Sequence, residues 1–275
     1  MNMRKRNKIL LIVIASVLAV LFITPLLWML STSFKSDFEA IGGASFLPQQ
    51  FTFDNYKSTL LDQTVPVFRW MFNSLFVGIA GVTIVLIIDS MAAYGLARLD
   101  VPFKKVLFPL FVSTLMIPWV ITFLPLYQQF SNLGLLNTYA PLILPYSANA
   151  FGVFLLYQFF RAFPKELEEA ARIDGANKWQ IFIKVVLPSA KPILATLAIF
   201  TFMGIYNDFL WPLVVTSTPD MRTVTTGIAI MQQGSFVSSY GKLMALTTIA
   251  TIPILIVFLI GQKSFIKGIT QSGIK

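Results

Sequence analysis

Two acidic residues inside otherwise apolar stretches are the first candidates for chemistry. They are Asp89 and Asp208. A charge at the centre of a membrane helix costs roughly 2.5–3.5 kcal/mol on insertion scales, so each should be paired, hydrated or close to a water-filled path. An aspartyl protease also needs two intramembrane acids, but its acids share a proton at close range, and no Gly-x-Gly-Asp motif surrounds either residue. We therefore predict both as candidates for a translocation path rather than for catalysis.

The other usual catalytic groups are missing from the sequence. The 275 residues include no cysteine and no histidine, which excludes disulfides, thiolate and imidazole metal sites and the commonest general base. No Gly-x-x-x-x-Gly-Lys-Ser/Thr loop is present, so the chain cannot hold ATP in the usual way. We expect no catalytic residue, no metal and no cofactor bound by this chain, and hence no enzyme activity of its own.

Composition indicates an all-α membrane protein. Hydrophobic residues make up 56% of the chain and charged residues 12%, against about 25% charged in soluble domains. Runs of about 20 apolar residues can cross a hydrocarbon core of roughly 30 Å as helices. Six spans are predicted: Ile9–Leu30, Trp70–Leu96, Val106–Phe130, Ala140–Phe160, Pro192–Val215 and Leu243–Gln262. Four prolines, Pro109, Pro118, Pro125 and Pro253, are expected to kink the third and sixth spans.

The distribution of lysine and arginine predicts the orientation. The two ends of the chain and the second and fourth loops hold 16 of these residues, and the opposite loops hold five. Cytoplasmic loops carry the excess, so both termini are predicted to be cytoplasmic. The basic start could instead be a cleaved signal peptide, but its apolar run is longer than the usual 7–15 residues and no small-x-small site follows. The net charge of +9 is spread over short loops, which argues against nucleic acid as a partner.

These spans divide the chain into four parts. Residues 1–33 form a cytoplasmic start and the first membrane helix, and residues 34–69 form an extracytoplasmic loop. In that loop Phe53, Tyr56, Leu60 and Leu61 have helical spacing, which predicts a short amphipathic helix along the membrane surface. Residues 70–262 form the transmembrane core, which includes a long cytoplasmic loop at 161–191, and residues 263–275 form a cytoplasmic tail.

The loop 161–191 has the pattern of two short helices. Pro164 suits the first position of a helix, Glu166, Glu168 and Glu169 suit its positive end, and Gly175 can terminate it. This predicts a helix over Lys165–Asp174. A second amphipathic piece should follow, with Trp179, Phe182, Val185 and Val186 on one side, and end near Pro188.

The first of these helices has little side-chain bulk on one part of its surface. Ala170, Ala171 and Gly175 lie together, flanked by Glu169 and Asp174. Such a surface lets the backbone of another protein approach closely while the charges fix its register. A solvated helix without a partner is the alternative, because charged helical faces are usually exposed to water.

At these residues the chain resembles the permease subunits of binding-protein-dependent ATP-binding cassette (ABC) importers. The matching residues are Glu169-Ala170-Ala171, Asp174-Gly175-Ala176, Phe182 and Leu187-Pro188. The resemblance implies the type I ABC importer transmembrane-domain fold, with this segment as the coupling helix that enters a cleft of a separate ATPase subunit. Glu169 would then be the polar contact, and Ala170, Ala171 and Gly175 would allow the close fit.

Further motifs resemble the carbohydrate branch of that family and its second, maltose-permease-like subunit. They are Asn73-Ser74-Leu75, Ala92-Ala93-Tyr94-Gly95-Leu96-Ala97-Arg98, Pro125-Leu126-Tyr127, Asn207-Asp208-Phe209-Leu210-Trp211-Pro212 and the ending Gly268–Lys275. Two departures are Tyr206, where tryptophan is usual, and a tail that often continues one glycine further. The tail of some relatives inserts between the ATPase subunits, and this departure puts the same docking of this tail in doubt.

The resemblance implies an assembly in the bacterial cytoplasmic membrane. The partners would be a second homologous permease subunit, two ATPase subunits that hold ATP and Mg²⁺, an extracytoplasmic solute-binding protein and the lipid bilayer. The expected solute is a mono- or oligosaccharide, with a polyol or a glycerol phosphate as alternatives. An ion-coupled secondary transporter is the rival class, but it should show internal repeats, and the long loop would then have no purpose.

One group of residues is predicted for the translocation path besides Asp89. Asn207 and Asp208 form a polar pair beside Phe209 and Trp211, and aromatic rings of this kind bind sugar rings. Packing between the two permease subunits is an equally good interpretation, because polar residues commonly join membrane helices.

Overall fold

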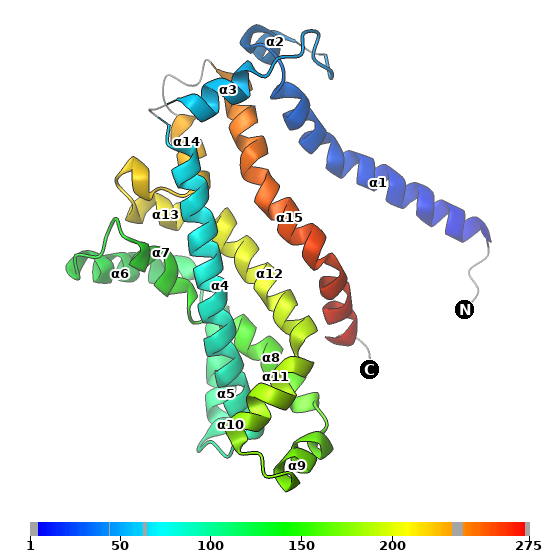
Figure 1. Ribbon diagram of the computed structural model, residues 1–275, viewed down its shortest axis with the longest axis vertical. Coiled ribbons are helices and arrows are strands. Elements are labelled where there is room, and N and C mark those ends of the chain that lie inside the picture. The colour runs from blue at the N-terminus through cyan, green and yellow to red at the C-terminus, as the bar shows by residue number, and fades with distance from the viewer. Residues whose placement is uncertain (1–4, 44, 63–64, 233–238, 273–275) are drawn as a thin grey trace. The chain divides into compact units, whose positions relative to one another are not determined.

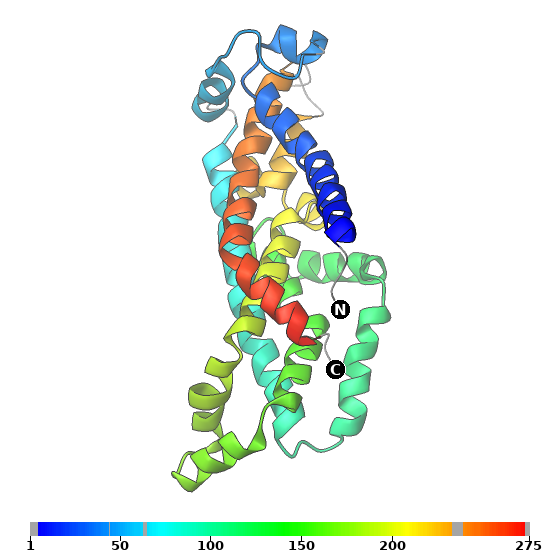
Figure 2. The same ribbon diagram turned by 90° about the vertical axis from the view of Figure 1, so that its right-hand side faces the viewer.

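The computed structural model describes residues 5–43, 45–62, 65–232 and 239–272, with side chains described from Asn7 to Gln262. Within these ranges the regular elements are all helical (Figures 1 and 2). The chain forms two compact units: residues 1–68 with 227–252, and residues 69–226 with 253–275. An all-α architecture is therefore confirmed over the described part of the chain.

Four of the six predicted spans are long, apolar helical segments. They are Asn7–Thr32, Val67–Arg98, Tyr139–Ala162 and Tyr240–Gln262. Two further pairs, Lys104–Met116 with Trp119–Asn132 and Lys178–Ser189 with Lys191–Asn207, are bent by 95° and 76°. The predicted number of six is reached only if each bent pair counts as one span.

The third predicted span is not one helix. It consists of α5 (Lys104–Ser113), the 3₁₀ turn η1 (Thr114–Met116) and α6 (Trp119–Asn132), and Figure 2 shows α5 and α6 nearly at right angles. The helix breaks before Pro118, because the proline ring disfavours a helical conformation of the preceding residue. Ile117 is accordingly extended, with ψ 115°. The kink expected from the prolines of the predicted span Val106–Phe130 therefore occurs at Pro118, as a bend of 95°, whereas Pro109 and Pro125 stay inside helices.

The fifth predicted span is also interrupted. Helix α12 (Lys191–Asn207) ends where Asp208 becomes extended, with φ −65° and ψ 133°, and α13 (Leu210–Val215) follows. The motif that begins at Asn207 is therefore a break between two helices, and the predicted span Pro192–Val215 is one continuous helix only as far as Asn207. Beyond α13 come the 3₁₀ turn η4 (Pro219–Met221) and α14 (Val224–Met231).

The first unit contains α1 (Lys5–Thr32), α2 (Asp37–Gly42), α3 (Asp54–Leu61) and the start of α15 (Tyr240–Ser272). The predicted short helix forms as α3, but it buries Asn55 and Thr59, and Leu61 is 77% exposed. Asn55 donates to the carbonyls of Ser33 and Lys35 at 2.9 and 2.7 Å. A Cβ on Gly241 would lie 2.6 Å from the Asn55 amide, so glycine allows α15 to approach α3 closely.

The second unit packs its long helices through glycine. Helix α4 (Val67–Arg98) runs beside α12 in both views (Figures 1 and 2). A Cβ on Gly78 would lie 2.8 Å from the ring of Phe202, and one on Gly81 would lie 2.4 Å from Ile205. Close approach of this kind is typical of membrane helices, whose association depends on van der Waals packing.

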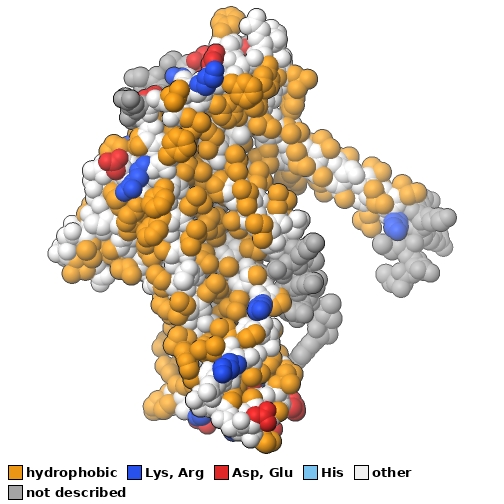
Figure 3. All heavy atoms as spheres, viewed as in Figure 1, with side chains coloured by type: hydrophobic (Ala, Val, Ile, Leu, Met, Phe, Trp, Pro, Cys, Tyr) orange, Lys and Arg blue, Asp and Glu red, His pale blue; other side chains and the backbone are white. Residues whose placement is uncertain are grey.

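The core of this unit continues toward its loop 161–191. Tyr94 of α4 packs against Phe160 of α8 (Ala150–Ala162) and against Phe182, with ring centroids 6.0 and 4.8 Å apart. All three rings are buried. In the space-filling view charged side chains gather at the end that carries α9 (Lys165–Ile173), while hydrophobic side chains cover much of the visible surface away from that end (Figure 3).

Candidate functional site

The predicted coupling helix forms as α9, one residue shorter than expected. Pro164 is the N-cap residue of this helix, with ψ 126°, so its predicted place as first helical residue was wrong. Glu166 and Glu168 lie in the first turn, where carboxylates interact favourably with the positive end of the helix dipole.

The end of α9 is closed by a glycine in the left-handed region. Gly175 has φ +84°, its N–H donates to the carbonyl of Arg172 at 3.1 Å, and the N–H of Ala176 donates to that of Ala171 at 2.9 Å. These two bonds form a Schellman motif, which satisfies the free carbonyls at the end of a helix. The motif reverses the chain immediately after Asp174.

The second helical segment of the loop begins with a capping box. The side chains of Asn177 and Gln180 exchange bonds with the backbone N–H groups at both positions, each at 2.9 Å. The segment comprises α10 (Lys178–Ile181), the π-helical stretch η3 (Phe182–Val186) and α11 (Leu187–Ser189). It buries Ile181, Phe182 and Val186, whereas Trp179 is 56% exposed. Trp179 still shares a side with Phe182, as predicted, because their ring centroids lie 5.6 Å apart.

The predicted coupling residues divide by exposure. Glu169, Ala170, Asp174, Gly175 and Pro188 are exposed, and Ala171, Ala176 and Leu187 are half-buried against the core of the unit. Three large apolar side chains near them are also exposed: Leu167 at 50%, Ile173 at 87% and Trp179 at 56%. Apolar and small side chains exposed together among charges are typical of a protein interface. This surface, formed by α9 and the start of α10, is called the coupling surface below (Figure 1).

A buried ion pair joins α4 to the coupling helix. Arg98 Nε lies 3.1 Å from Glu168 Oε1, and the two side chains are 6% and 11% exposed. Arg98 also donates through Nη2 to the carbonyl of Phe163. Arg98 Nε and Glu168 Oε1 are close but lack hydrogen-bond geometry with each other. Sequence reasoning missed this pair, because it assigned Glu168 only to the helix dipole and Arg98 only to a family motif.

Asp89 lies in the interior of the second unit. Its residue is fully buried, and neither carboxylate oxygen has a hydrogen-bond partner among the described atoms. It faces the first turn of α8, where Asn149 caps the helix, and a Cβ on Gly152 would lie 2.0 Å from Asp89 Oδ2. Since α8 covers the carboxylate within this chain, Asp89 does not face a second permease subunit.

Asp208 lies at the helix break and is half-buried. Its carboxylate accepts a hydrogen bond from the hydroxyl of Tyr146, and its carbonyl accepts one from Thr225 at 2.8 Å. Among the described residues Asp89 makes no hydrogen bond to Asp208, so the two carboxylates do not share a proton. The geometry therefore offers no protease dyad.

The neighbours of Asp208 in the motif have different environments. Asn207 and Phe209 are exposed, whereas Trp211 is 4% exposed. The indole N–H of Trp211 donates to the carbonyl of Pro141 at 2.7 Å, and its ring meets that of Phe123 edge to face at 5.3 Å. These contacts hold α13 against α7 (Tyr139–Ile143), which contains Pro141, and against α6, which contains Phe123.

The motif that begins at Asn73 holds the chain after α13. Asn73 donates to the carbonyls of Asp220 and Arg222 at 2.7 and 2.9 Å, and its own oxygen accepts from the Tyr139 hydroxyl at 2.7 Å. The next residue, Ser74, accepts the backbone N–H of Val224 at 2.8 Å. These bonds fix the loop around η4 on the first turns of α4.

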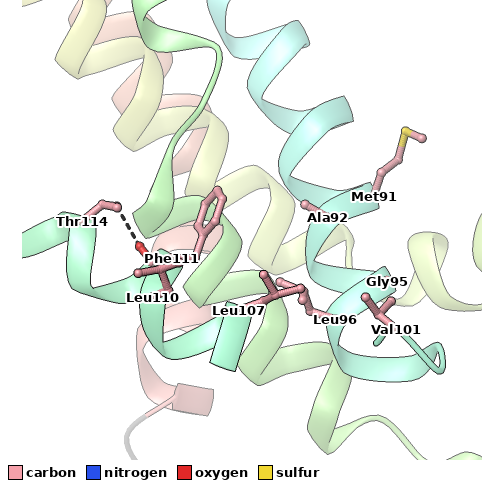
Figure 4. Close-up of a pocket in the computed structure, with 9 residues that line it drawn as sticks. All are labelled: Met91, Ala92, Gly95, Leu96, Val101, Leu107, Leu110, Phe111 and Thr114. Atoms are coloured by element: carbon pink, nitrogen blue, oxygen red, sulfur yellow. Dashed lines mark hydrogen bonds between the residues drawn. The ribbon is translucent and has the colours of Figure 1, made fainter. Parts of the chain in front are cut away.

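An apolar groove of about 540 Å³ lies between α4 and α5 (Figure 4). It is lined by Met91, Ala92, Gly95, Leu96, Val101, Leu107, Leu110, Phe111 and Thr114. The Thr114 hydroxyl already donates to the carbonyl of Phe111 at 2.7 Å. A polar solute needs several convergent hydrogen-bonding groups, so this groove does not have the chemistry of a sugar site. No group of three acidic side chains that could hold a metal ion occurs among the described residues.

Comparison with known proteins identifies the class. The family model described as "Binding-protein-dependent transport system inner membrane component" matches residues 90–271, and the chain belongs to this family. The suspected membership in the ABC importer permeases is thus confirmed.

Individual relatives cover nearly the whole chain. The diacetylchitobiose uptake system permease protein NgcG of Streptomyces coelicolor is 35% identical over 92% of this chain and 84% of its own length. The arabinooligosaccharides transport system permease protein AraQ of Halalkalibacterium halodurans is 36% identical over 94% and 93%. The trehalose/maltose transport system permease protein MalG of Thermococcus litoralis is 33% identical over 98% and 97%.

A solved structure has the same fold. A chain of a bacterial ABC transporter involved in the import of the acidic polysaccharide alginate superposes with a TM-score of 0.83 at 25% identity, covering 96% of this chain and 99% of that one. The fold of an ABC importer membrane subunit is therefore shown for this chain.

Proposed function

We propose that this chain is the permease subunit of an ATP-driven importer and forms part of the path of a mono- or oligosaccharide across the bacterial cytoplasmic membrane. The observation that carries the proposal is the coupling surface: Glu169 and Ala170 are exposed beside a helix end that Gly175 closes. A partner ATPase can approach the backbone there because Ala170 and Gly175 carry little side-chain bulk. ATP with Mg²⁺ would be held by the partners, and this chain would be no enzyme.

The proposed assembly contains a second permease, two ATPase subunits and an extracytoplasmic solute-binding protein, with both termini of this chain in the cytoplasm. Support for a binding protein comes from the family's description. It also comes from a solved alginate transporter, a chain of which has the same general fold as this one and which was solved in complex with a periplasmic protein. The excess of lysine and arginine in one set of loops supports the orientation. The tail 263–275 lies outside the described side chains, so its docking is a proposal from resemblance alone.

The helix break at Asn207–Phe209 is the proposed contribution to the path. Asn207 and Phe209 are exposed, so an amide and an aromatic face are available to a sugar, and Asp208 is oriented by Tyr146. Unwound backbone at membrane depth is tolerated where it lines a cavity or is buried in protein. We assign Trp211 and Asp89 to packing instead, because both are buried within the unit.

The sugar assignment rests on relatives, whose names specify diacetylchitobiose, lactose and arabinooligosaccharides. A test is uptake of radiolabelled lactose, maltose, trehalose and diacetylchitobiose by cells that express the whole assembly. Uptake of glycerol phosphate or a polyol instead would correct the substrate and leave the importer assignment intact. Uptake that persists without any partner ATPase and collapses with the ion gradient would establish the rival secondary transporter.

The coupling surface is tested by Glu169→Lys, with Glu166→Lys as the matched control on the same helix. Both residues are exposed, so both variants should fold. We expect Glu169→Lys to lose co-purification of the ATPase and uptake, since like-charge or mismatched contacts at an interface cost several kcal/mol. Normal association and uptake in Glu169→Lys would contradict the assignment.

Two substitutions separate the backbone role of Gly175 from close approach. Gly175→Asn tolerates the left-handed conformation but adds bulk, whereas Gly175→Ala adds one methyl group and strains the backbone by roughly 1–2 kcal/mol. If close approach matters, Gly175→Asn loses ATPase association although α9 keeps its Schellman end. Wild-type association of Gly175→Asn would mean that glycine serves the turn alone.

A further inference from the structure

Two sequence motifs about 70 residues apart meet in the folded chain. Arg98 ends the motif that runs from Ala92, and Glu168 directly precedes the Glu169-Ala170-Ala171 motif. The ion pair between them, at 3.1 Å and nearly excluded from solvent, connects the last residue of α4 with the first turn of α9.

Residues at the end of α4 also contact the chain segments directly before and after α9. Arg98 donates to the carbonyl of Phe163, which directly precedes the N-cap Pro164. One turn earlier in α4, Tyr94 packs against Phe160 before α9 and against Phe182 after it. The end of α4 therefore contacts α9 itself and both segments that flank it.

The role of the pair is better explained by position than by stability. Removing two charges from water offsets most of their attraction, so a buried pair contributes little net stability, although an unpaired buried charge is costly. A fixed geometry between two elements is the better-attested use of such a pair. Glu168 and Glu169 are neighbours on one helix, but Glu168 is buried toward α4 while Glu169 is exposed on the coupling surface.

We propose that Glu168 and Arg98 are positioning residues that lock α9 to the end of α4, so that displacement of the coupling surface moves this membrane helix as part of the same body. Glu169 would engage the ATPase, and Glu168 would pass the displacement inward. This inference rests on the proposed function and assigns a role to two residues that do not themselves contact the partner.

The chain offers a clean measurement because it contains no native cysteine. Spin labels are attached at Asp100→Cys, two residues beyond Arg98, and at Lys165→Cys, the first residue of α9; both positions are exposed. The label-to-label distance is measured in the complete assembly without nucleotide and with ATP, Mg²⁺ and vanadate. We expect one shared distance in both states for the otherwise unaltered chain.

In Glu168→Gln the label-to-label distance should differ between the two nucleotide states, while ATPase co-purification stays normal. In Glu166→Gln, on the exposed side of the same turn, the distance should be the same in both states. Import of radiolabelled sugar per ATP hydrolysed should fall roughly fivefold or more in Glu168→Gln, which is the lower range of typical coupling between sites. If Glu168→Gln does not fold, the double variant Arg98→Gln with Glu168→Gln removes both charges and leaves neither buried alone.

Two results would overturn the proposal. One is a label-to-label distance that stays the same in both nucleotide states in Glu168→Gln or in the double variant. The other is loss of ATPase co-purification in Glu168→Gln to the extent seen in Glu169→Lys, which would place Glu168 in the docking surface. Failure of the proposed function is distinguishable, since Glu169→Lys would then keep its ATPase and the distance in the isolated chain would still report the link between α4 and α9.

Discussion

The tightest packing position around a polar group is Gly152, and its replacement gives a quantitative prediction. A Cβ there would lie 2.0 Å from Asp89 Oδ2, 3.0 Å from its Cγ and 3.1 Å from Leu197 Cδ1. For ordinary contact the carboxylate oxygen would have to withdraw by about 1.4 Å within a fully buried site. Overpacking of this kind costs about 1–3 kcal/mol, which is a change of roughly 5- to 150-fold in the ratio of folded to unfolded chain.

The assay is the free energy of unfolding of Gly152→Ala in detergent micelles, titrated with a denaturing detergent. Gly204→Ala is the matched control, because a Cβ there meets nothing within 4 Å in α12, and it should be neutral or stabilise by up to about 1 kcal/mol. Adding Asp89→Ala to Gly152→Ala removes the clashing oxygen, so the double variant should recover stability by at least about 0.5 kcal/mol beyond additivity. Strictly additive effects, or equal stability of Gly152→Ala and Gly204→Ala, would refute the described contact between α4 and α8.

Two further predictions concern polar groups outside the spans. The backbone N–H of Gln49, at 2.8 Å, holds the pKa of Glu39 below its ordinary value of 4.5. The stabilisation is therefore complete above about pH 4.5 and is lost as pH falls through the lowered pKa. The protection of the amides of residues 36–43 from hydrogen exchange, relative to the rate of an unfolded chain at the same pH, should fall there, and Glu39→Gln should abolish this pH dependence. Asn73→Ala should loosen the loop around η4 at a cost of about 1–3 kcal/mol, because the Arg222 carbonyl loses its bond from Asn73 while the Asp220 carbonyl keeps only its bond from Arg69. Thiol labelling of Met221→Cys should then become faster, and an unchanged rate would show that other contacts hold the loop.

Length and capping signals were sufficient to predict much of this architecture. Apolar runs identified four long helical spans, one of which is interrupted at residues 147–149. The sequence from Pro164 to Gly175 identified α9, because its caps are local and depend on few neighbours. A bend at Pro118 was predicted but its size was not, since a proline inside a membrane helix can either kink it or end it, and the break at Asp208 escaped prediction. Which of these outcomes occurs depends on tertiary contacts that periodicity does not contain.

The environments of single side chains were the least predictable feature. The burial of Asp89 depends on where α8 begins, and the pairing of Glu168 depends on a residue of another helix. Neither fact is a property of local sequence. The π-helical stretch η3 is a further feature that a regular 3.6-residue period does not predict.

That stretch also changes how the loop can be aligned with its relatives. A π turn contains one residue more than an α turn, and each α-helical residue accounts for about 100° of rotation. Residues before Phe182 and residues after Val186 therefore do not follow one common 3.6-residue period, because the stretch between them contains one extra residue. The backbone nevertheless continues without a gap. A relative that lacks one residue here would close a regular α turn in place of the π turn, so its capped start would keep the same azimuth relative to α12 and the missing residue belongs within 182–186 of the alignment.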